Sequence, residues 1–315
     1  MIESRQFRVY RQKFTTPIMT AHGQWNEKEA IILRKEDSKG KVSFGEISLV
    51  NGFTFDRLND LLPRVENWCA KGEIGENKLI QSAVSSLDSE IWDCSKGNQN
   101  YKIKTAKLFR KDYKFKIGDT IKVKIGIRNT EDEVKNVKGL IQQTGSGCKL
   151  RLDANEGIEM EDLLLWDEAF KENKEIEFLE QPFSGESIGD LLKIQSLIDL
   201  PLALDESIVW LQDLSYFCNQ KWLGKFIIKP CLMSNWDRTI NFISSNSEKT
   251  IVSTSFESPF GYEAVLRCAS YSNRVAGLDR KLFSNCEGEF SQHHEEILIP
   301  YSVSVEDLDN LWASL

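Results

Sequence analysis

Histidine is scarce in this chain, which has three histidines among 315 residues. His22, His293 and His294 all lie outside the predicted strand ends that are described below, so the sequence offers no histidine base at those positions. His293 and His294 fall in a polar stretch, and we expect both on the exposed surface.

Cysteine is present but follows no metal-binding or disulfide pattern. The seven cysteines are an odd number, they are widely spaced, and no two form a C-x-x-C motif. A disulfide framework or a cysteine-based zinc site is therefore not expected.

The chain also lacks long apolar runs and an excess of positive charge. No apolar run approaches the roughly 20 residues that span a bilayer, and the first residues contain no apolar signal core. The net charge is −8 and the isoelectric point is near 5.2, which is a poor match for nucleic acid or an anionic membrane. We expect a cytoplasmic protein with a small-molecule carboxylate as its partner, and with no nucleic-acid or membrane partner. The oligomeric state is left open, and a monomer is compatible with the sequence.

Short apolar segments alternate with longer amphipathic segments from about residue 120 onward. The expected strands are 120–125, 148–152, 176–179, 200–204, 226–228 and 250–253, and the expected helices are 130–143, 160–172, 188–198, 210–220 and 236–244. Strands that alternate with helices predict a parallel sheet. Six such units, spaced by roughly 24 to 29 residues, favour a closed (β/α) barrel over an open sheet.

The first hundred residues have a different pattern. Strand-like segments at 7–10, 30–34 and 41–47 are followed by helical segments at 55–69 and 82–94. We therefore predict an α/β protein with an α+β capping domain at 1–100 and a (β/α) barrel catalytic domain at 101–289. The segment 290–315 is expected to pack back onto the capping domain.

Ionisable residues stand where successive predicted strands end. In chain order they are Lys122 and Lys124, Asp153, Glu180, Asp205 and Lys229. The carboxyl ends of the strands of such a barrel meet at one mouth, where catalysis takes place. Three carboxylates at one mouth would repel one another without a cation, and ligation by oxygen alone suits Mg²⁺. A lysine amine near other cations loses its proton more readily and can act as a base.

Each of these residues has a simpler interpretation when it is taken alone. A single aspartate at a strand end is more often a helix N-cap, and Lys122 with Lys124 is compatible with a solvated strand face. The complete ordered set of lysine, aspartate, glutamate, aspartate and lysine, one from each successive strand end, favours the catalytic interpretation.

Eight short motifs carry a resemblance to a known family. They are Gly45–Ser48 with Gly52–Phe53, Val84–Asp93, Arg151–Asn155, Leu179–Pro182, Leu204–Ser207, Ile228–Pro230, Ser253–Ser258 and Gly277–Asp279. They resemble the enolase superfamily in its branch with a K-x-K motif and, within that branch, the o-succinylbenzoate synthases. The resemblance covers nearly the whole chain and implies an enolase-like fold, which is a modified (β/α) TIM barrel with an α+β capping domain.

Two positions depart from the family pattern. Leu49-Val-Asn51 replaces the usual prolines, and Thr254 stands where serine is common. These departures leave the implied metal site intact. They make the identity of the substrate harder to infer from the sequence.

The resemblance also implies roles for the charged residues. Asp153, Glu180 and Asp205 are implied as ligands of Mg²⁺, for which Mn²⁺ can substitute. Lys124 is implied as the general base and then the general acid, Lys229 as the cation that faces it across the substrate, and Lys122 as an electrostatic aid.

Further positions are implied as substrate contacts. These are Arg151, Ser253, Thr254 and Gly277, and the loop Met19–Gly23 is implied to close over the substrate.

The implied reaction is the Mg²⁺-dependent dehydration of 2-succinyl-6-hydroxy-2,4-cyclohexadiene-1-carboxylate to o-succinylbenzoate. It proceeds by removal of a proton alpha to a carboxylate and is a step of menaquinone or phylloquinone biosynthesis. One alternative is an N-acylamino acid racemase or dipeptide epimerase of the same superfamily, which uses one lysine on each face of the alpha carbon. Dipeptide epimerases carry a D-x-D motif near the last strand, whereas Gly277-Leu-Asp279-Arg280 supplies only one aspartate here. A second alternative is a non-catalytic binding protein on the same barrel, which is disfavoured because unused buried carboxylates are costly.

Overall fold

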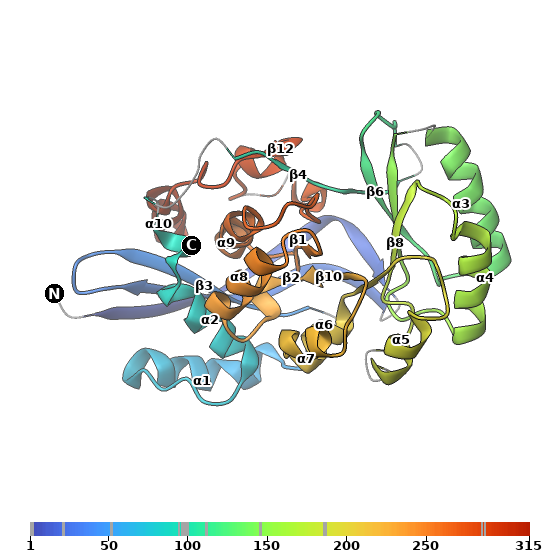
Figure 1. Cartoon of the computed structure of the whole chain (residues 1–315). Coiled ribbons are helices and arrows are strands. Elements are labelled where there is room, and N and C mark those ends of the chain that lie inside the picture. The colour runs from blue at the N-terminus through green and yellow to red at the C-terminus, as the bar shows by residue number, and fades with distance from the viewer. Residues whose placement is uncertain are drawn as a thin grey trace. The chain divides into compact units, whose positions relative to one another are not determined.

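The computed structural model describes residues 3–20, 23–50, 53–93, 95, 101–110, 113–144, 147–184, 188–284, 286 and 288–315. The chain divides into two compact units (Figure 1). The first unit contains Met1–Lys104, Lys229–Glu248 and Val252–Leu315, and the second contains Thr105–Ile228 and Lys249–Ile251. The domain boundaries that the sequence suggested, at residues 100 and 289, stay a prediction.

The second unit is built on a parallel sheet. The strand order is β11 (Thr250–Val252), β10 (Lys225–Ile228), β9 (Leu202–Leu204), β8 (Ile176–Glu180), β7 (Lys149–Asp153), β6 (Thr120–Lys124) and β5 (Lys107–Leu108). Six of these strands match the predicted ones to within two residues at each end. The order is linear, so the seven described strands form a curled half-barrel. The closed barrel expected from the sequence is not formed by the described strands.

Helices alternate with these strands. They are α3 (Thr130–Thr144), α4 (Met160–Phe170), α5 (Ile188–Ile194), α6 (Glu206–Leu211) and α7 (Leu214–Asn219). Helices α3 and α4 lie side by side along the sheet (Figure 1). The prediction of a single helix at 210–220 is wrong. Helix α6 ends because Gln212 adopts a left-handed φ of 59°. Helix α7 then begins at Asp213, whose side chain accepts hydrogen bonds from the backbone N–H groups of Ser215 and Tyr216.

The first unit contains an antiparallel sheet of three strands. These are β1 (Ser4–Thr20), β2 (Gly23–Glu36) and β3 (Val42–Ser48), in the order β1-β2-β3. The meander was predicted, but β1 and β2 are longer than expected. Strand β1 continues because alternate residues beyond the predicted segment, Gln12 and Phe14, are still buried on one face. The implied closing loop Met19–Gly23 includes residues 21 and 22, which lie outside the described residues.

The other elements of the first unit are mostly helical. They are α1 (Leu58–Lys71), α2 (Lys78–Asp88), η1 (Glu90–Trp92), η4 (Pro230–Leu232), α8 (Trp236–Ser245), α9 (Pro259–Ala269), η5 (Lys281–Phe283), η6 (Ser291–His294) and α10 (Val305–Ser314), with the short strands β4 (Ile103–Lys104) and β12 (Ile297–Leu298). The C-terminal helix α10 contacts the sheet, since Arg34 pairs with Asp309 at 2.6 Å and the rings of Phe44 and Trp312 lie 6.2 Å apart. None of the described helices is long and apolar enough to cross a membrane.

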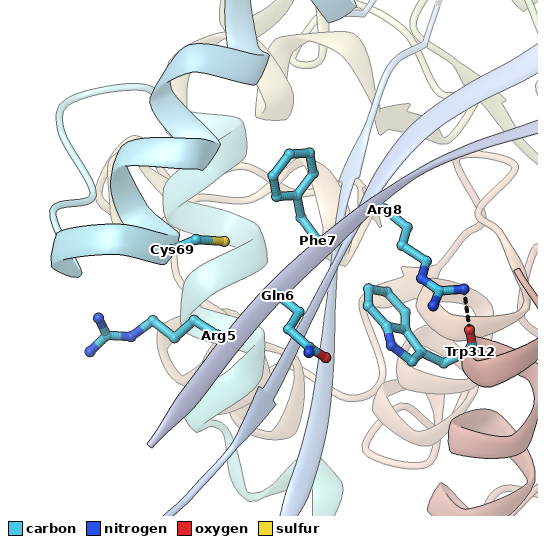
Figure 2. Close-up of a pocket in the computed structure, with 6 residues that line it drawn as sticks. All are labelled: Arg5, Gln6, Phe7, Arg8, Cys69 and Trp312. Carbon is cyan, nitrogen blue, oxygen red and sulfur yellow. Dashed lines mark hydrogen bonds between the residues drawn. The ribbon is translucent and has the colours of Figure 1, made fainter. Parts of the chain in front are cut away.

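A groove of about 400 Å³ lies beside the start of β1 (Figure 2). Its lining residues are Arg5, Gln6, Phe7, Arg8, Cys69 and Trp312. Figure 2 shows the guanidinium of Arg8 directed at the Trp312 carbonyl, to which it donates at 2.6 Å. Arg5 pairs with Glu3 at 2.7 Å. Both arginines therefore have structural contacts, and the groove contains none of the predicted site residues.

The expectation that His293 is exposed is wrong. His293 is 1% exposed, and its Nε2 lies 2.9 Å from the Glu263 carboxylate on α9. The same carboxylate group pairs with Arg267 at 2.7 Å. The polar segment around His293 is therefore not a solvated surface. It places the His293 ring against the buried carboxylate of Glu263.

Candidate active site

The parallel register of the second unit brings four predicted residues together. Lys124 is level with Asp153 across β6 and β7, and Asp153 is level with Glu180 across β7 and β8. Glu180 pairs with Ala203 of β9, two residues before Asp205. The strand ends therefore place one lysine and three carboxylates on neighbouring strands at the same edge of the sheet.

The lysines make direct ion pairs with these carboxylates. Lys122 Nζ lies 2.7 Å from Asp153 Oδ2 and 2.8 Å from Glu180 Oε1. Lys124 Nζ lies 2.6 Å from Asp153 Oδ2. The two side chains share a strand face because they are two residues apart. The side chain of Lys124 is 41% exposed, whereas that of Asp153 is buried.

Burial and neighbouring charges together set the protonation of this cluster. Burial alone would raise the pKa of Asp153, but the ammonium groups of Lys122 and Lys124 lower it well below its usual range. Burial and the nearby carboxylates of Asp153 and Asp205 together raise the pKa of Glu180 to about 8, although Lys122 lowers it. Burial alone would lower the pKa of Lys122, but the surrounding carboxylates raise it. The cluster therefore favours additional positive charge.

The donor set fits a divalent cation in chemistry and charge. Asp153, Glu180, Asp205 and Glu206 are all buried. These four carboxyl groups outnumber the two lysine side chains, Lys122 and Lys124, that pair with the cluster. The donors are oxygens, which Mg²⁺ prefers. However, no group of three or more His, Cys, Asp or Glu side chains in the described part of the chain is already arranged to hold a metal. The fit rests on the donor set and its charge, and not on a preformed coordination geometry.

The helix-cap interpretation fails for Asp205. This residue occupies the N-cap position of α6, but its side chain makes no capping hydrogen bond. The loop that carries it is held instead by Gln181, whose Oε1 accepts from the backbone N–H groups of Asp205 and Ser207 at 3.0 and 3.1 Å. Gln181 is completely buried, and its Nε2 donates to the hydroxyl of Ser207 at 2.7 Å.

Gln181 and Asn155 are functional candidates that the charged pattern did not select. The side-chain oxygen of Asn155 accepts from Lys124 Nζ, and its Nδ2 donates to Glu206 Oε1 at 3.0 Å. Both amides lie inside motifs that carried the family resemblance, Arg151–Asn155 and Leu179–Pro182. Their place inside these motifs was the sequence signal that could have identified them, because an uncharged amide does not stand out among other polar residues.

Arg151 faces a structural partner. Its Nε donates to Glu177 Oε2 at 2.7 Å, its guanidinium lies 5.2 Å from the centre of the Phe178 ring, and the residue is buried. Its role in substrate contact stays a prediction.

Lys229 follows the end of β10 and belongs to the first unit. The residue is 6% exposed, and its Nζ lies 4.1 Å from the centre of the Phe53 ring. Phe53 comes from the Gly52–Phe53 motif, of which residue 52 lies outside the described residues. The two motifs Ile228–Pro230 and Gly52–Phe53 are thus joined by a cation–π contact.

The remaining predicted substrate contacts lie in the first unit and are closely packed. Ser253 and Gly277 form a parallel bridge, and the Ser253 hydroxyl donates to the Gly277 carbonyl at 3.3 Å. A Cβ atom at Gly277 would lie 2.7 Å from Ser253 Oγ, so glycine permits this approach. The Thr254 hydroxyl donates to Glu257 Oε2 at 2.5 Å. Their roles toward a substrate stay predictions.

The motif Gly45–Ser48 forms part of a buried polar network. Glu46 Oε2 accepts from the backbone N–H and the hydroxyl of Ser258, at 2.9 and 2.5 Å. Lys28 Nζ donates to the Ser48 hydroxyl at 2.6 Å and to the Ser255 carbonyl at 3.3 Å. Burial raises the pKa of Glu46 to about 7 and lowers the pKa of Lys28. Two family-like motifs, Gly45–Ser48 and Ser253–Ser258, therefore contact each other.

Comparison with known proteins agrees with the motif resemblance. Residues 104–234 match the family model described as enolase C-terminal domain-like. The o-succinylbenzoate synthase of Thermosynechococcus vestitus is 27% identical over 249 residues, which are 74% of this chain and 77% of that protein. The N-succinyl-L-Arg/Lys racemase of Bacillus cereus is 20% identical over 241 residues, which are 63% of this chain and 64% of that protein.

A solved structure supports the fold over the whole chain. The crystal structure of o-succinylbenzoate synthase from Thermosynechococcus elongatus BP-1, complexed with Mg in the active site, has a TM-score of 0.73 and is 21% identical. The match covers 99% of this chain and 100% of that chain. The enolase-like fold expected from the motifs is confirmed, and residues 104–234 are similar to the enolase C-terminal domain-like family.

Proposed function

We propose that the protein is a Mg²⁺-dependent o-succinylbenzoate synthase of menaquinone or phylloquinone biosynthesis. The observation that carries the proposal is the pairing of the partly exposed Lys124 with Asp153 beside Glu180, on adjacent parallel strand ends. The similarity to o-succinylbenzoate synthase over 74% of the chain supports this choice within the superfamily.

Lys124 performs both proton transfers in the proposed reaction. Its neutral amine removes the proton alpha to the ring carboxylate of the cyclohexadiene, and the C–H electron pair passes into the conjugated carboxylate. The C–O bond of the hydroxyl group then breaks, and the Lys124 ammonium gives its proton to the departing oxygen, which leaves as water. No oxidant is needed, and the ring becomes aromatic.

Asp153, Glu180 and Asp205 would hold Mg²⁺. When bound, the ion would supply positive charge where the substrate carboxylate gains negative charge. Asn155 orients the Lys124 amine, and Gln181 fixes the loop of Asp205. Lys229 supplies a second positive charge that stabilises the carbanion-like state.

The racemase alternative has its own support, because an N-succinylamino acid racemase is among the relatives. One sequence feature favours the dehydratase, because Gly277-Leu-Asp279-Arg280 supplies only one aspartate where dipeptide epimerases carry a D-x-D motif. The position after Asp279 is Arg280, which is buried, pairs with Glu289 at 2.6 Å and donates to the Glu257 carbonyl at 2.7 Å. Arg280, the neighbour of this aspartate, therefore has structural contacts.

The first experiment tests the reaction and its base. The purified protein should convert the cyclohexadiene to o-succinylbenzoate, lose activity in EDTA and recover it with Mg²⁺ or Mn²⁺. Lys124→Arg should lose nearly all activity because guanidinium does not give up its proton. Lys171→Ala is the matched control, since it removes a surface lysine of the same unit. Wild-type kcat in Lys124→Arg, or full turnover in EDTA, would refute the assignment.

The second experiment separates dehydration from racemisation. Lys229→Arg keeps a positive charge but cannot exchange protons. A dehydratase should keep part of its activity, whereas a racemase should lose racemisation of both enantiomers. If N-succinylamino acids are turned over and the cyclohexadiene is not, the racemase assignment replaces the dehydratase.

A further inference from the structure

The Phe53 ring contacts the Lys229 ammonium, and both residues belong to the first unit. The separation of 4.1 Å between Nζ and the ring centre is well inside the range of about 6 Å for a cation–π interaction. Lys229 is almost fully buried, and desolvation strengthens such a contact. This contact therefore acts directly on the second lysine of the proposed reaction.

Backbone contacts hold both sides of the pair. The Lys229 carbonyl accepts from the backbone N–H of Leu232 at 2.9 Å, and the Ser82 hydroxyl donates to the Pro230 carbonyl at 3.4 Å. On the other side, the Val50 carbonyl accepts from the backbone N–H groups of Phe53 and Thr54, at 3.1 and 2.9 Å. The ring and the amine are thus each attached to a hydrogen-bonded turn.

A ring face distinguishes the two forms of an amine. Its negative face attracts an ammonium ion and gives a neutral amine no comparable attraction. A one-base dehydratase needs its second lysine as a fixed cation, whereas a two-base racemase needs that lysine to release and accept protons. The residue beside Lys229 can therefore influence which reaction the site performs.

We propose that Phe53 is a positioning residue that holds Lys229 as a fixed cation and thereby favours one-base dehydration over two-base racemisation. The inference rests on the proposed function for the role of Lys229. It extends that function by assigning reaction selectivity to a residue outside the charged set.

The experiment compares an aliphatic with an aromatic replacement of the ring. Phe53→Leu keeps apolar bulk without a ring face, and Phe53→Tyr and Phe53→Trp keep the face. Phe55→Leu is the matched control, because Phe55 lies two residues away and is 79% exposed. Each variant is assayed for dehydration of the cyclohexadiene and for alpha-proton exchange in D₂O with each enantiomer of N-succinylphenylalanine. Thermal unfolding verifies that each variant is folded.

We expect Phe53→Leu to lower kcat for dehydration roughly tenfold, with a much smaller change in KM. Wild type should exchange mainly one enantiomer, and Phe53→Leu should gain exchange of the other. At least one of the two aromatic variants should behave like wild type, as should Phe55→Leu.

Three results would overturn the proposal. They are unchanged kcat and exchange in Phe53→Leu, equal losses in folded leucine and aromatic variants, or comparable exchange of both enantiomers by wild type. Absence of dehydration by wild type would instead refute the proposed function. The exchange measurements with the two enantiomers would then still decide whether Phe53 controls the proton traffic of Lys229.

Discussion

Replacing Glu46 by glutamine should change how stability depends on pH. Glu46 is buried, and burial raises its pKa from the ordinary 4.5 to about 7 in the folded protein. A carboxyl group with a raised pKa holds its proton in the folded state while the unfolded state has lost it. The unfolded state binds fewer protons across this range, so the free energy of unfolding falls as the pH rises from about 4.5 to about 7 and is then level.

The size of this effect follows from the shift. A rise from 4.5 to about 7 corresponds to about 3 kcal/mol at about 1.4 kcal/mol for each pH unit. Glutamine preserves the shape and an oxygen acceptor for Ser258, but it does not titrate. The melting temperature of Glu46→Gln relative to wild type should therefore rise by several degrees between about pH 5 and about pH 8.

The assay is thermal unfolding of both proteins across that pH range. Ile47→Val is the matched control, since Ile47 is a fully buried, uncharged neighbour. It should cost about 1 kcal/mol at every pH. If the difference between Glu46→Gln and wild type is as constant with pH as that of the control, the reasoning about Glu46 is wrong.

Two further substitutions test buried contacts of the first unit. Arg267→Met should lower the free energy of unfolding by about 3–5 kcal/mol in chemical denaturation, because it leaves Glu263 without its 2.7 Å partner and removes hydrogen bonds to the carbonyls of Ile91 and Val303. A loss below about 1 kcal/mol would contradict a tightly held pair. Gly277→Ala should destabilise by about 1–3 kcal/mol because its Cβ would approach Ser253 Oγ. Adding Ser253→Ala should restore part of this loss, and no recovery would show that the crowding has another source.

The parallel strands, and the proximity of the charged residues at their ends, could be predicted because both depend on local patterns. Short buried strands are continuous apolar runs, and parallel register aligns residues that end successive strands. Lys124, Asp153 and Glu180 could therefore be grouped before the structure was known. The amides of Gln181 and Asn155 could not, since their importance depends on which backbone or side-chain group lies opposite.

Errors arose where distant residues determine the outcome. His293 was expected on the surface because its neighbours in sequence are polar, but its environment is set by Glu263, thirty residues earlier. The helix predicted at 210–220 has suitable apolar spacing, yet a left-handed residue at Gln212 interrupts it. The closed barrel was inferred from the number of strand–helix units. That number does not determine whether the first and last strands of the sheet pair with each other.

Charge balance separates the buried clusters of the two units. In the first unit, Arg267 offsets Glu263 and Arg280 offsets Glu289, so these pairs need no ligand. In the cluster of Lys28 with Glu46, burial raises the pKa of Glu46 to about 7. A proton retained on this carboxyl group then reduces the buried negative charge.

The cluster of the second unit differs, because Lys122 and Lys124 pair with Asp153 and Glu180, and the carboxyl groups of Asp205 and Glu206 are buried as well. The nearby carboxylates of Asp153 and Asp205 add to the rise that burial causes in the pKa of Glu180. An excess of buried carboxyl groups over cations costs stability unless hydrogen bonds, bound protons or a bound cation offset it. Under the proposed function, a divalent cation would supply positive charge to this cluster, which is the physical reason to propose the chemistry at Lys124 rather than at the balanced clusters.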